Sequence, residues 1–258
     1  MEQQVSFNNY LGEKLSGTLH LPDDATESGI VLGHCFTCSR NTAILRHLCE
    51  QLVQENFMAL RFDFSGNGRS EGQFADSTYS KQISEMQTAV AFILKKGVSW
   101  VGLVGHSMGA VIAVLTAARM STVKSACVLA GRMSGLNATH FFSPSQLREL
   151  RNTGSVSFTS RGRSLKISNS FFADTEQYNL PEIVANLRTP LLVVHGDQDE
   201  IIPVQEAYQA HRLNPEGITL SVVTDADHMF SNVEHRNIVI QQVVAWFKEQ
   251  RGTMHGYP

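Results

Sequence analysis

The most informative stretch of this sequence reads Leu103-Val104-Gly105-His106-Ser107-Met108-Gly109. An apolar run over 100–104 precedes it, and a second apolar run over 110–118 follows it. Strand, Gly-x-Ser-x-Gly and helix in this order are typical of a nucleophile elbow, a sharp turn that exposes a serine hydroxyl. Glycine at 105 and 109 leaves room for that turn. The stretch therefore predicts that Ser107 stands at the carboxyl end of a strand, with a helix N-terminus beside it.

Outward from this stretch, short apolar segments alternate with longer segments of helical periodicity. Strands are predicted at 5–10, 15–21, 30–34, 57–62, 100–104, 125–130, 191–195 and 219–223. Helices are predicted at 42–55, 80–96, 110–118, 204–213 and 235–250. Strands that alternate with helices form a mainly parallel sheet covered on both faces. The first two strands surround a turn at Gly12 and predict an antiparallel hairpin at one edge of that sheet.

The regular alternation stops between residues 131 and 188, where polar sequence with Gly and Ser separates two Phe-Phe pairs. Insertions of this length between regular units usually serve function, often as a lid. We therefore expect an α/β core formed by residues 1–130 and 189–258, and a cap formed by residues 131–188. Within the cap, a hairpin is expected near Gly162.

Composition narrows the classes of function. The 258 residues are 42% hydrophobic and 17% charged, with a net charge of −3, which gives no reason to expect a nucleic-acid partner. No apolar stretch reaches the roughly 18 residues that a membrane span needs, and no secretory signal is visible, so a cytoplasmic protein is expected. Four scattered cysteines in such a chain predict free thiols: Cys35, Cys38, Cys49 and Cys127.

A serine hydroxyl needs a base to remove its proton, and the base needs an acid to orient it. After an elbow serine, these partners follow in the order acid, then histidine. Asp197 and Asp199 lie just beyond the strand at 191–195, and His228 follows the last strand. The sequence therefore predicts a triad of Ser107, Asp199 and His228, with Asp197 as the rival acid.

These segments together resemble the α/β-hydrolase superfamily, and within it the bacterial serine esterases of the feruloyl or cinnamoyl type. The chain is also similar to the hydrolase half of fusions with a peroxide-resistance-type domain. The resemblance rests on segments spread over the chain outside residues 131–188: 34–37, 61–70, the elbow, 195–199 with Pro203, and 226–228.

The resemblance implies an α/β-hydrolase fold and a serine carboxylesterase that works through an acyl-enzyme. The pattern Gly-x-x-Asp-x-x-(Val/Ile)-Pro implies that Asp199 is the acid, and the backbone amides of Phe36 and Met108 are implied as the oxyanion hole. A thioesterase or acyltransferase would need the same residues, and a catalytically silent binding protein on this scaffold is the rival class. No cofactor and no metal are expected. The expected partner is a small ester, and the protein is expected to be a monomer or homodimer.

One position departs from the family pattern, because Cys35 stands where glycine usually precedes the oxyanion residue. A side chain there would lie near the reacting carbonyl, so Cys35 is expected to contact the substrate. Cys35-x-x-Cys38 also fits a redox pair or half of a zinc site, but no second such pair exists.

Two groups of residues in the predicted cap have alternative interpretations. The phenylalanines are predicted to line a substrate pocket, and could equally form a small core of the cap: Phe141, Phe142, Phe158, Phe171 and Phe172. Cationic residues outweigh Glu149 locally, which fits either a solvated face or affinity for an acidic substrate: Arg148, Arg151, Arg161, Arg163 and Lys166.

Overall fold

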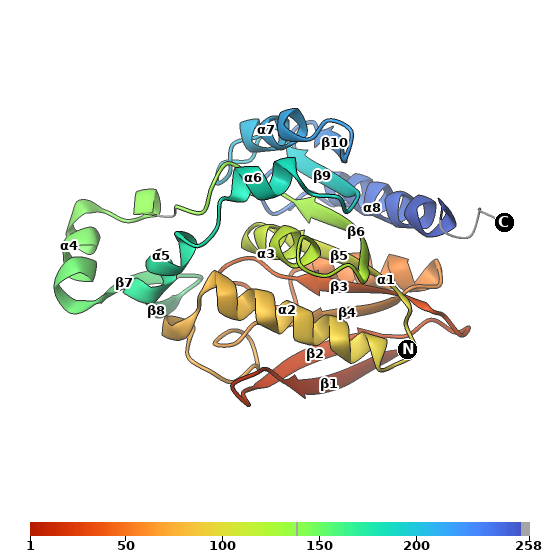
Figure 1. The fold of residues 1–258 in the computed structure, drawn as a ribbon, viewed down its shortest axis with the longest axis horizontal. Coiled ribbons are helices and arrows are strands. Elements are labelled where there is room, and N and C mark those ends of the chain that lie inside the picture. Colours follow the sequence, from red (N-terminus) through yellow and green to blue (C-terminus); the bar gives the residue numbers. More distant parts are fainter. Residues whose placement is uncertain (138, 254–258) are drawn as a thin grey trace.

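A central eight-stranded sheet organises the molecule (Figure 1), and the computed structural model describes residues 1–137 and 139–253. The strands lie in the order β1-β2-β4-β3-β5-β6-β9-β10. Their bounds are β1 Glu2–Asn8, β2 Lys14–His20, β3 Ser28–Gly33, β4 Met58–Phe62, β5 Trp100–His106, β6 Val123–Leu129, β9 Leu191–Gly196 and β10 Ile218–Val223. All neighbouring pairs from β4 to β10 are parallel, and β2 runs antiparallel to both β1 and β4. The expected mainly parallel sheet and its edge hairpin are confirmed.

Helices cover both faces of this sheet because the strands are apolar on both sides. Along β3, Val31 packs into the core beneath α2 and α3, whereas Ile30 and Leu32 pack toward α1 and α8. Successive side chains of a strand point to opposite faces, so one strand supplies both cores. The helices of the first face are α2 Tyr79–Leu94, α3 Met108–Ala117, α6 Leu180–Ala185 and α7 Gln205–Leu213, and those of the second are α1 Ala43–Gln54 and α8 Val233–Thr253.

Strand β5 extends two residues further than its apolar run, to His106. Gly105 is paired on both sides, with Gly33 of β3 and Val128 of β6. The glycine hides this extension from a hydropathy pattern, although its backbone continues the ladder. As a result Ser107 follows the strand directly, at the end of the sheet where the carboxyl ends of β3 and β9 also lie.

The chain leaves the sheet after β6 and returns with β9. Between them lie one short 3-10 helix and five longer elements: η2 Thr139–Phe141, α4 Pro144–Thr153, β7 Ser155–Ser160, β8 Arg163–Ser168, α5 Asn169–Thr175 and α6. Figure 1 shows α4, β7, β8 and α5 grouped beyond one end of the sheet, away from the N-terminus. Strands β7 and β8 pair antiparallel around Arg161 and Gly162, both at positive φ, so the predicted hairpin near Gly162 is confirmed.

Several contacts fasten this group to the core. The Asp174 carboxylate accepts a hydrogen bond from the backbone N–H of Ser80 at 2.8 Å. The hydroxyl of Ser168 donates to the carbonyl of Ala75 in the short 3-10 helix η1 Phe74–Asp76, at 2.7 Å. A further contact joins β7 to the loop after β3, where the hydroxyls of Ser160 and Thr37 lie 2.8 Å apart. Helix α6 packs instead against α3 and α7, so it lies over the sheet. The division at residues 131 and 188 stays a prediction.

Candidate active site

Ser107 occupies a strained turn between β5 and α3. Its φ of 57° and ψ of −115° lie where a non-glycine residue is rarely found. A Cβ on Gly105 would meet the carbonyl oxygen of Gly109 at 2.0 Å, and a Cβ on Gly109 would meet that of Gly33 at 2.5 Å. Both glycines are therefore required by close backbone approach, and the turn has the geometry of a nucleophile elbow.

The structure brings the side chains of Ser107, His228 and Asp199 together. The Nε2 atom of His228 lies 3.1 Å from Ser107 Oγ, and its Nδ1 atom lies 2.8 Å from Asp199 Oδ2. These residues come from loops that follow β5, β9 and β10, whose carboxyl ends meet at one edge of the sheet. A base placed between a hydroxyl and a carboxylate can remove the hydroxyl proton and be stabilised as a cation.

Asp199 is buried and held by four hydrogen-bond donors. Its Oδ1 accepts from the backbone N–H groups of Ile201 and Ile202, at 2.9 and 2.8 Å. Its Oδ2 lies 3.1 Å from His195 Nε2 as well as beside His228. Burial by itself opposes ionisation, but the hydrogen bonds from His195, His228 and Ile202 outweigh it and hold the pKa of Asp199 far below its usual value. The acid is therefore ionised at neutral pH.

Asp197, the rival acid, faces away from this cluster. Its Oδ1 accepts the backbone N–H of Asp225 at 2.7 Å, which closes the turn between β10 and the His228 loop. His195 is the partner that the sequence did not single out. Its Nε2–H points at both the Ile202 carbonyl, at 2.8 Å, and the Asp199 carboxylate. The only sequence signal for this role is the spacing of four residues between His195 and Asp199.

His106 contacts His228, the candidate base, through a hydrogen bond and a ring contact. Its Nε2–H donates to the carbonyl of His228 at 2.8 Å, and the two imidazole rings lie 5.2 Å apart. Burial, and then the neighbouring His228, lower the pKa of His106 to about 4. His106 is consequently neutral near pH 7 and adds no charge beside His228.

The loop after β3 carries the first expected oxyanion donor. His34 orders this loop, because its Nδ1–H donates to the Cys35 carbonyl at 2.7 Å and its Nε2 accepts the Phe64 N–H at 3.1 Å. Phe36 and Met108 both border the cavity above Ser107. Among the described residues, neither backbone N–H has an acceptor. Two unpaired donors beside a candidate nucleophile are what an oxyanion hole requires.

Cys35 and Cys38 form a disulfide, so the expectation of four free thiols is wrong for this pair. The Cys38 N–H donates to the Cys35 carbonyl at 3.1 Å, and this turn brings the two Cα atoms to 5.2 Å. That separation lies within the usual range for a disulfide. Cys49 and Cys127 are free and buried. Cys35 is buried and does not border the cavity at Ser107, so its expected contact with the substrate stays a prediction.

A cavity of about 540 Å³ opens above Ser107. Four of the predicted phenylalanines line it: Phe141, Phe142, Phe158 and Phe171. Phe172 does not, because it packs behind them against Phe142 and Phe171, so its predicted role as a pocket residue is wrong. Both interpretations of the aromatic group thus hold in part. Further apolar lining comes from residues that the sequence did not single out: Tyr79, Val111, Leu136, Ile201 and Ile202.

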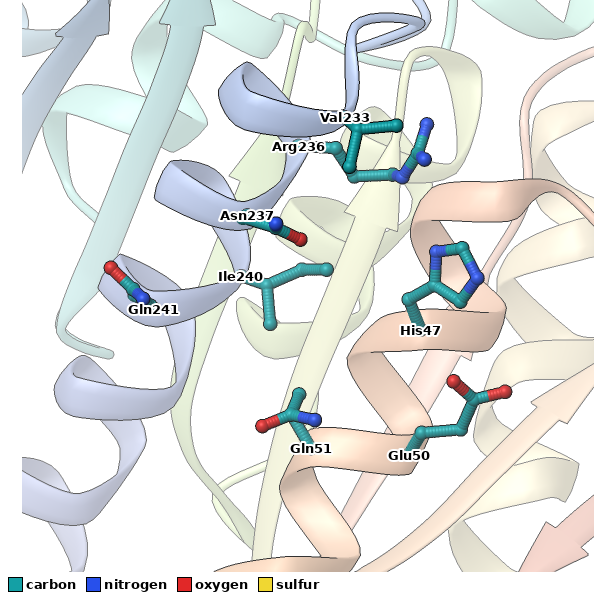
Figure 2. Close-up of a pocket in the computed structure, with 8 residues that line it drawn as sticks. All are labelled: His47, Glu50, Gln51, Val233, Arg236, Asn237, Ile240 and Gln241. Carbon is teal, nitrogen blue, oxygen red and sulfur yellow. The ribbon is translucent and has the colours of Figure 1, made fainter.

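A separate hollow of about 410 Å³ lies between α1 and α8. Figure 2 shows His47, Glu50 and Gln51 of α1 facing a row of α8 side chains: Val233, Arg236, Asn237, Ile240 and Gln241. None of the residues that surround Ser107 lines it. The hollow is polar and carries no paired nucleophile and base, so the candidate chemistry belongs to the cavity at Ser107.

Within residues 1–137 and 139–253, no group of three or more His, Cys, Asp or Glu side chains could hold a metal ion. None of the described helices is long and apolar enough to cross a membrane.

The comparisons with known proteins agree with this geometry. The family described as serine aminopeptidase, S33, matches residues 39–180, more than half of the chain. The chain belongs to this family of α/β-hydrolases. In this α/β-hydrolase the matched segment includes the elbow and most of the predicted cap. The family match indicates that the protein is a hydrolase.

Two curated relatives of this α/β-hydrolase match at low identity. A monoacylglycerol lipase of Mycolicibacterium smegmatis is 24% identical over 93% of this chain and 95% of its own length. A mitochondrial palmitoyl-protein thioesterase of Mus musculus is 26% identical over 66% of this chain and 58% of its own length.

Solved structures share the fold over nearly the whole chain. The esterase Est1E of Butyrivibrio proteoclasticus with bound ferulic acid superposes with a TM-score of 0.83 and 22% identity, covering 96% of this chain and 99% of its own. An esterase domain from Rhodothermus marinus superposes with a TM-score of 0.73 and 24% identity, covering 97% and 98%. At these identities the likeness concerns the fold.

Proposed function

We propose that this α/β-hydrolase is a serine carboxylesterase that cleaves small to medium esters through an acyl-enzyme. The observation that carries the proposal is the chain of contacts from Ser107 through His228 to the ionised Asp199. At the other end of this chain, Ser107 borders a cavity lined by aromatic rings. A nucleophile, a base and an orienting acid in this arrangement serve acyl transfer.

In the proposed reaction Ser107 Oγ attacks the ester carbonyl carbon while His228 Nε2 takes its proton. The carbonyl oxygen becomes an oxyanion, which accepts hydrogen bonds from the backbone N–H groups of Phe36 and Met108. The C–O bond to the alcohol then breaks, and His228 returns its proton to the departing oxygen. Water attacks the acyl-enzyme in the same way and releases the acid. Asp199 stays ionised throughout and stabilises the imidazolium.

We further propose that the segment after β6 acts as a cap that selects the substrate. Phe158 lies nearly parallel to Phe36 with ring centroids 6.0 Å apart, and Phe36 contacts Phe171 at 5.5 Å. Aromatic walls of this kind favour an apolar acyl or aryl group. The cap therefore supplies the apolar surface, and the sheet supplies the reacting groups.

A thioester is the second substrate class to test, because one curated relative is named a thioesterase and the proposed chemistry is the same. A thiolate leaves more readily than an alkoxide, so an esterase of this kind should also cleave thioesters. Turnover of thioesters without turnover of esters would identify a thioesterase instead.

The test is hydrolysis of 4-nitrophenyl butyrate and of a matched butyryl thioester by the purified chain. Ser107→Ala should lower kcat on the ester by roughly 10⁶-fold, because triad members act as a unit. Ser145→Ala, an exposed serine on α4, serves as the matched control. An organophosphorus reagent should add one covalent mass, on the peptide that contains Ser107. Labelling of another peptide, or equal activity in both variants, would overturn the proposal.

A further inference from the structure

A second cavity, of about 350 Å³, lies on the other side of the loop that carries the proposed oxyanion donor. Its lining residues come from this loop, the start of α1, the turn at Gly68 and the β7–β8 hairpin: Thr37, Cys38, Ser39, Asn41, Thr42, Gly68, Arg161 and Arg163. We call it the arginine pocket. Two of its lining residues are cationic and none is acidic, so the pocket is suited to a negatively charged group.

Both arginines come from the β7–β8 hairpin: Arg161 lies in its turn, and Arg163 is the first residue of β8. In the described part of the chain, neither guanidinium forms an ion pair with a carboxylate. Arg163 donates from Nη2 to the Thr37 carbonyl at 3.1 Å, which uses one of its five N–H groups. Within residues 1–137 and 139–253, the guanidinium of Arg161 forms one hydrogen bond, from Nη2 to the Met229 sulfur at 3.5 Å. Most of the donors of both side chains are therefore available to a ligand.

The opposite wall of the arginine pocket also offers donors. The hydroxyl of Thr42 is buried and has no hydrogen-bond partner. Thr42 precedes the first turn of α1 without capping it. The Asp63 carboxylate lies beneath Gly68, is already paired with Arg40 and accepts the backbone N–H of Arg69 at 2.9 Å. The charge of Asp63 is therefore balanced within the protein.

The arginine pocket adjoins the proposed reaction centre. Thr37 borders both this pocket and the cavity at Ser107, and its hydroxyl lies 2.8 Å from that of Ser160 on β7. Met229, which Arg161 contacts, directly follows His228. In the proposed mechanism His228 protonates the leaving alcohol, so that half of the ester lies on the His228 side. Arg161 thus stands next to the leaving group.

We propose that the arginine pocket is an anion subsite that binds a carboxylate or phosphate carried by the alcohol half of the substrate. The planar guanidinium fork matches both groups. The inference rests on the proposed esterase function, and it names the substrate class more closely: esters whose leaving alcohol is anionic. It also gives a role to two of the cationic residues of the cap, Arg161 and Arg163, which line the pocket.

The test compares matched esters that differ in one charge. For the alcohol half, the substrates are 4-(butyryloxy)phenylacetate, its neutral methyl ester, and the phosphonate analogue with its dimethyl ester. For the acyl half, they are the 4-nitrophenyl monoester of glutarate and the corresponding methyl diester. The measured quantity is the ratio of kcat/KM for the charged and neutral member of each pair, so a general loss of activity cancels.

Arg161→Gln and Arg163→Gln should each lower the alcohol-half ratio by about tenfold, as expected for a charge-assisted hydrogen bond that solvent partly screens. The preference for the charged ester should also weaken as NaCl rises. Lys166→Gln is the matched control, because Lys166 is an exposed cation of the same hairpin that does not line the pocket. Its ratio should stay within about twofold of the unsubstituted chain, since exposed charges act weakly at a distance.

The outcomes separate the subsite from the esterase proposal. Hydrolysis of none of these esters, charged or neutral, would overturn the proposed function itself. Hydrolysis of neutral esters with unchanged ratios in both arginine variants would overturn the subsite alone. An equal fall in Lys166→Gln would also overturn it, because that result indicates a diffuse field. A larger change in the acyl-half ratio would contradict the assignment to the leaving alcohol. A carboxylate effect without a phosphonate effect, or the reverse, supports the subsite and identifies the anion it binds.

Discussion

The loops at the carboxyl ends of the sheet strands, called the sheet edge below, and the segment after β6 both border the cavity at Ser107. The two regions are built differently. At the sheet edge, polar side chains are buried and multiply bonded: Asp199 has four donors, and both ring nitrogens of His228 have partners. In the segment after β6, the apolar part of the cavity wall is mainly phenylalanine, with Phe142 in contact with Phe158, and Phe141 is 55% exposed.

In the proposed esterase, this difference assigns the reaction to the sheet-edge residues and the selection of substrates to the segment after β6. Hydrogen bonds with one favourable geometry hold the sheet-edge residues in place, as a proton transfer requires. Ring contacts tolerate changes of shape and volume, as a surface for different acyl groups requires. Substitutions at the sheet edge should therefore change kcat for every substrate, whereas substitutions in the wall should change the choice among substrates.

The largest expected effect distinguishes the two neighbouring carboxylates at the sheet edge. Asp199→Asn should lower kcat on 4-nitrophenyl butyrate by about 10⁴-fold, because an amide cannot hold His228 in the required tautomer. Asp197→Asn, the matched control, removes only an acceptor for the Asp225 N–H and should cost less than about tenfold. Steady-state kinetics of both variants check this. The reverse ranking would place the acid at Asp197.

A smaller effect concerns the stability of the sheet edge in acid. The pKa of His106 is lowered to about 4 in the folded chain, so the unfolded chain takes up a proton first as the pH falls below about 6.5. The contribution of His106 to stability should therefore fall between pH 6.5 and pH 4 and level off below pH 4. The contribution of His106 is about 3 kcal/mol at most, from roughly 2.5 pKa units.

Urea unfolding at several pH values between 7 and 4 measures this dependence. His106→Gln, which keeps a donor for the His228 carbonyl, should make the profile less steep than that of the unsubstituted chain. His235→Gln is the control, because His235 lies on α8 away from the site. An identical slope in His106→Gln and the unsubstituted chain would show that His106 does not carry the effect.

The smallest expected effect lies in the cavity wall. Phe158→Ala should lower kcat/KM about tenfold for an aryl or hexanoyl ester and less than about threefold for an acetate ester, because only larger acyl groups reach the lost ring surface. Phe92→Ala is the matched control: its ring stacks on Phe7 at the sheet and does not line the cavity. Equal losses for all esters in Phe158→Ala would contradict a selective role of the wall.

Local sequence patterns predicted most of the sheet and the position of Ser107. Alternation of apolar and helical segments identified every strand of the large sheet within a few residues, because burial on both faces demands continuous apolar runs. The cysteine prediction failed at Cys35 and Cys38, since counting cysteines along a chain ignores a turn that brings two of them together. The position of Phe172 could not be read from the sequence, because only the folded chain shows that its ring packs against Phe142 and Phe171 while Phe171 faces the cavity.

The sequence by itself determined the chemistry available to this protein: an elbow serine, a histidine after the last strand, two candidate acids and a cationic, aromatic insertion. Only the tertiary structure decided which acid contacts His228, which rings face Ser107, and that Arg161 and Arg163 border one pocket. The physical reason is distance along the chain. A turn or an amphipathic helix depends on residues a few positions apart, whereas His228 and Ser107, 121 positions apart, meet only because parallel strands end at the same edge of a sheet.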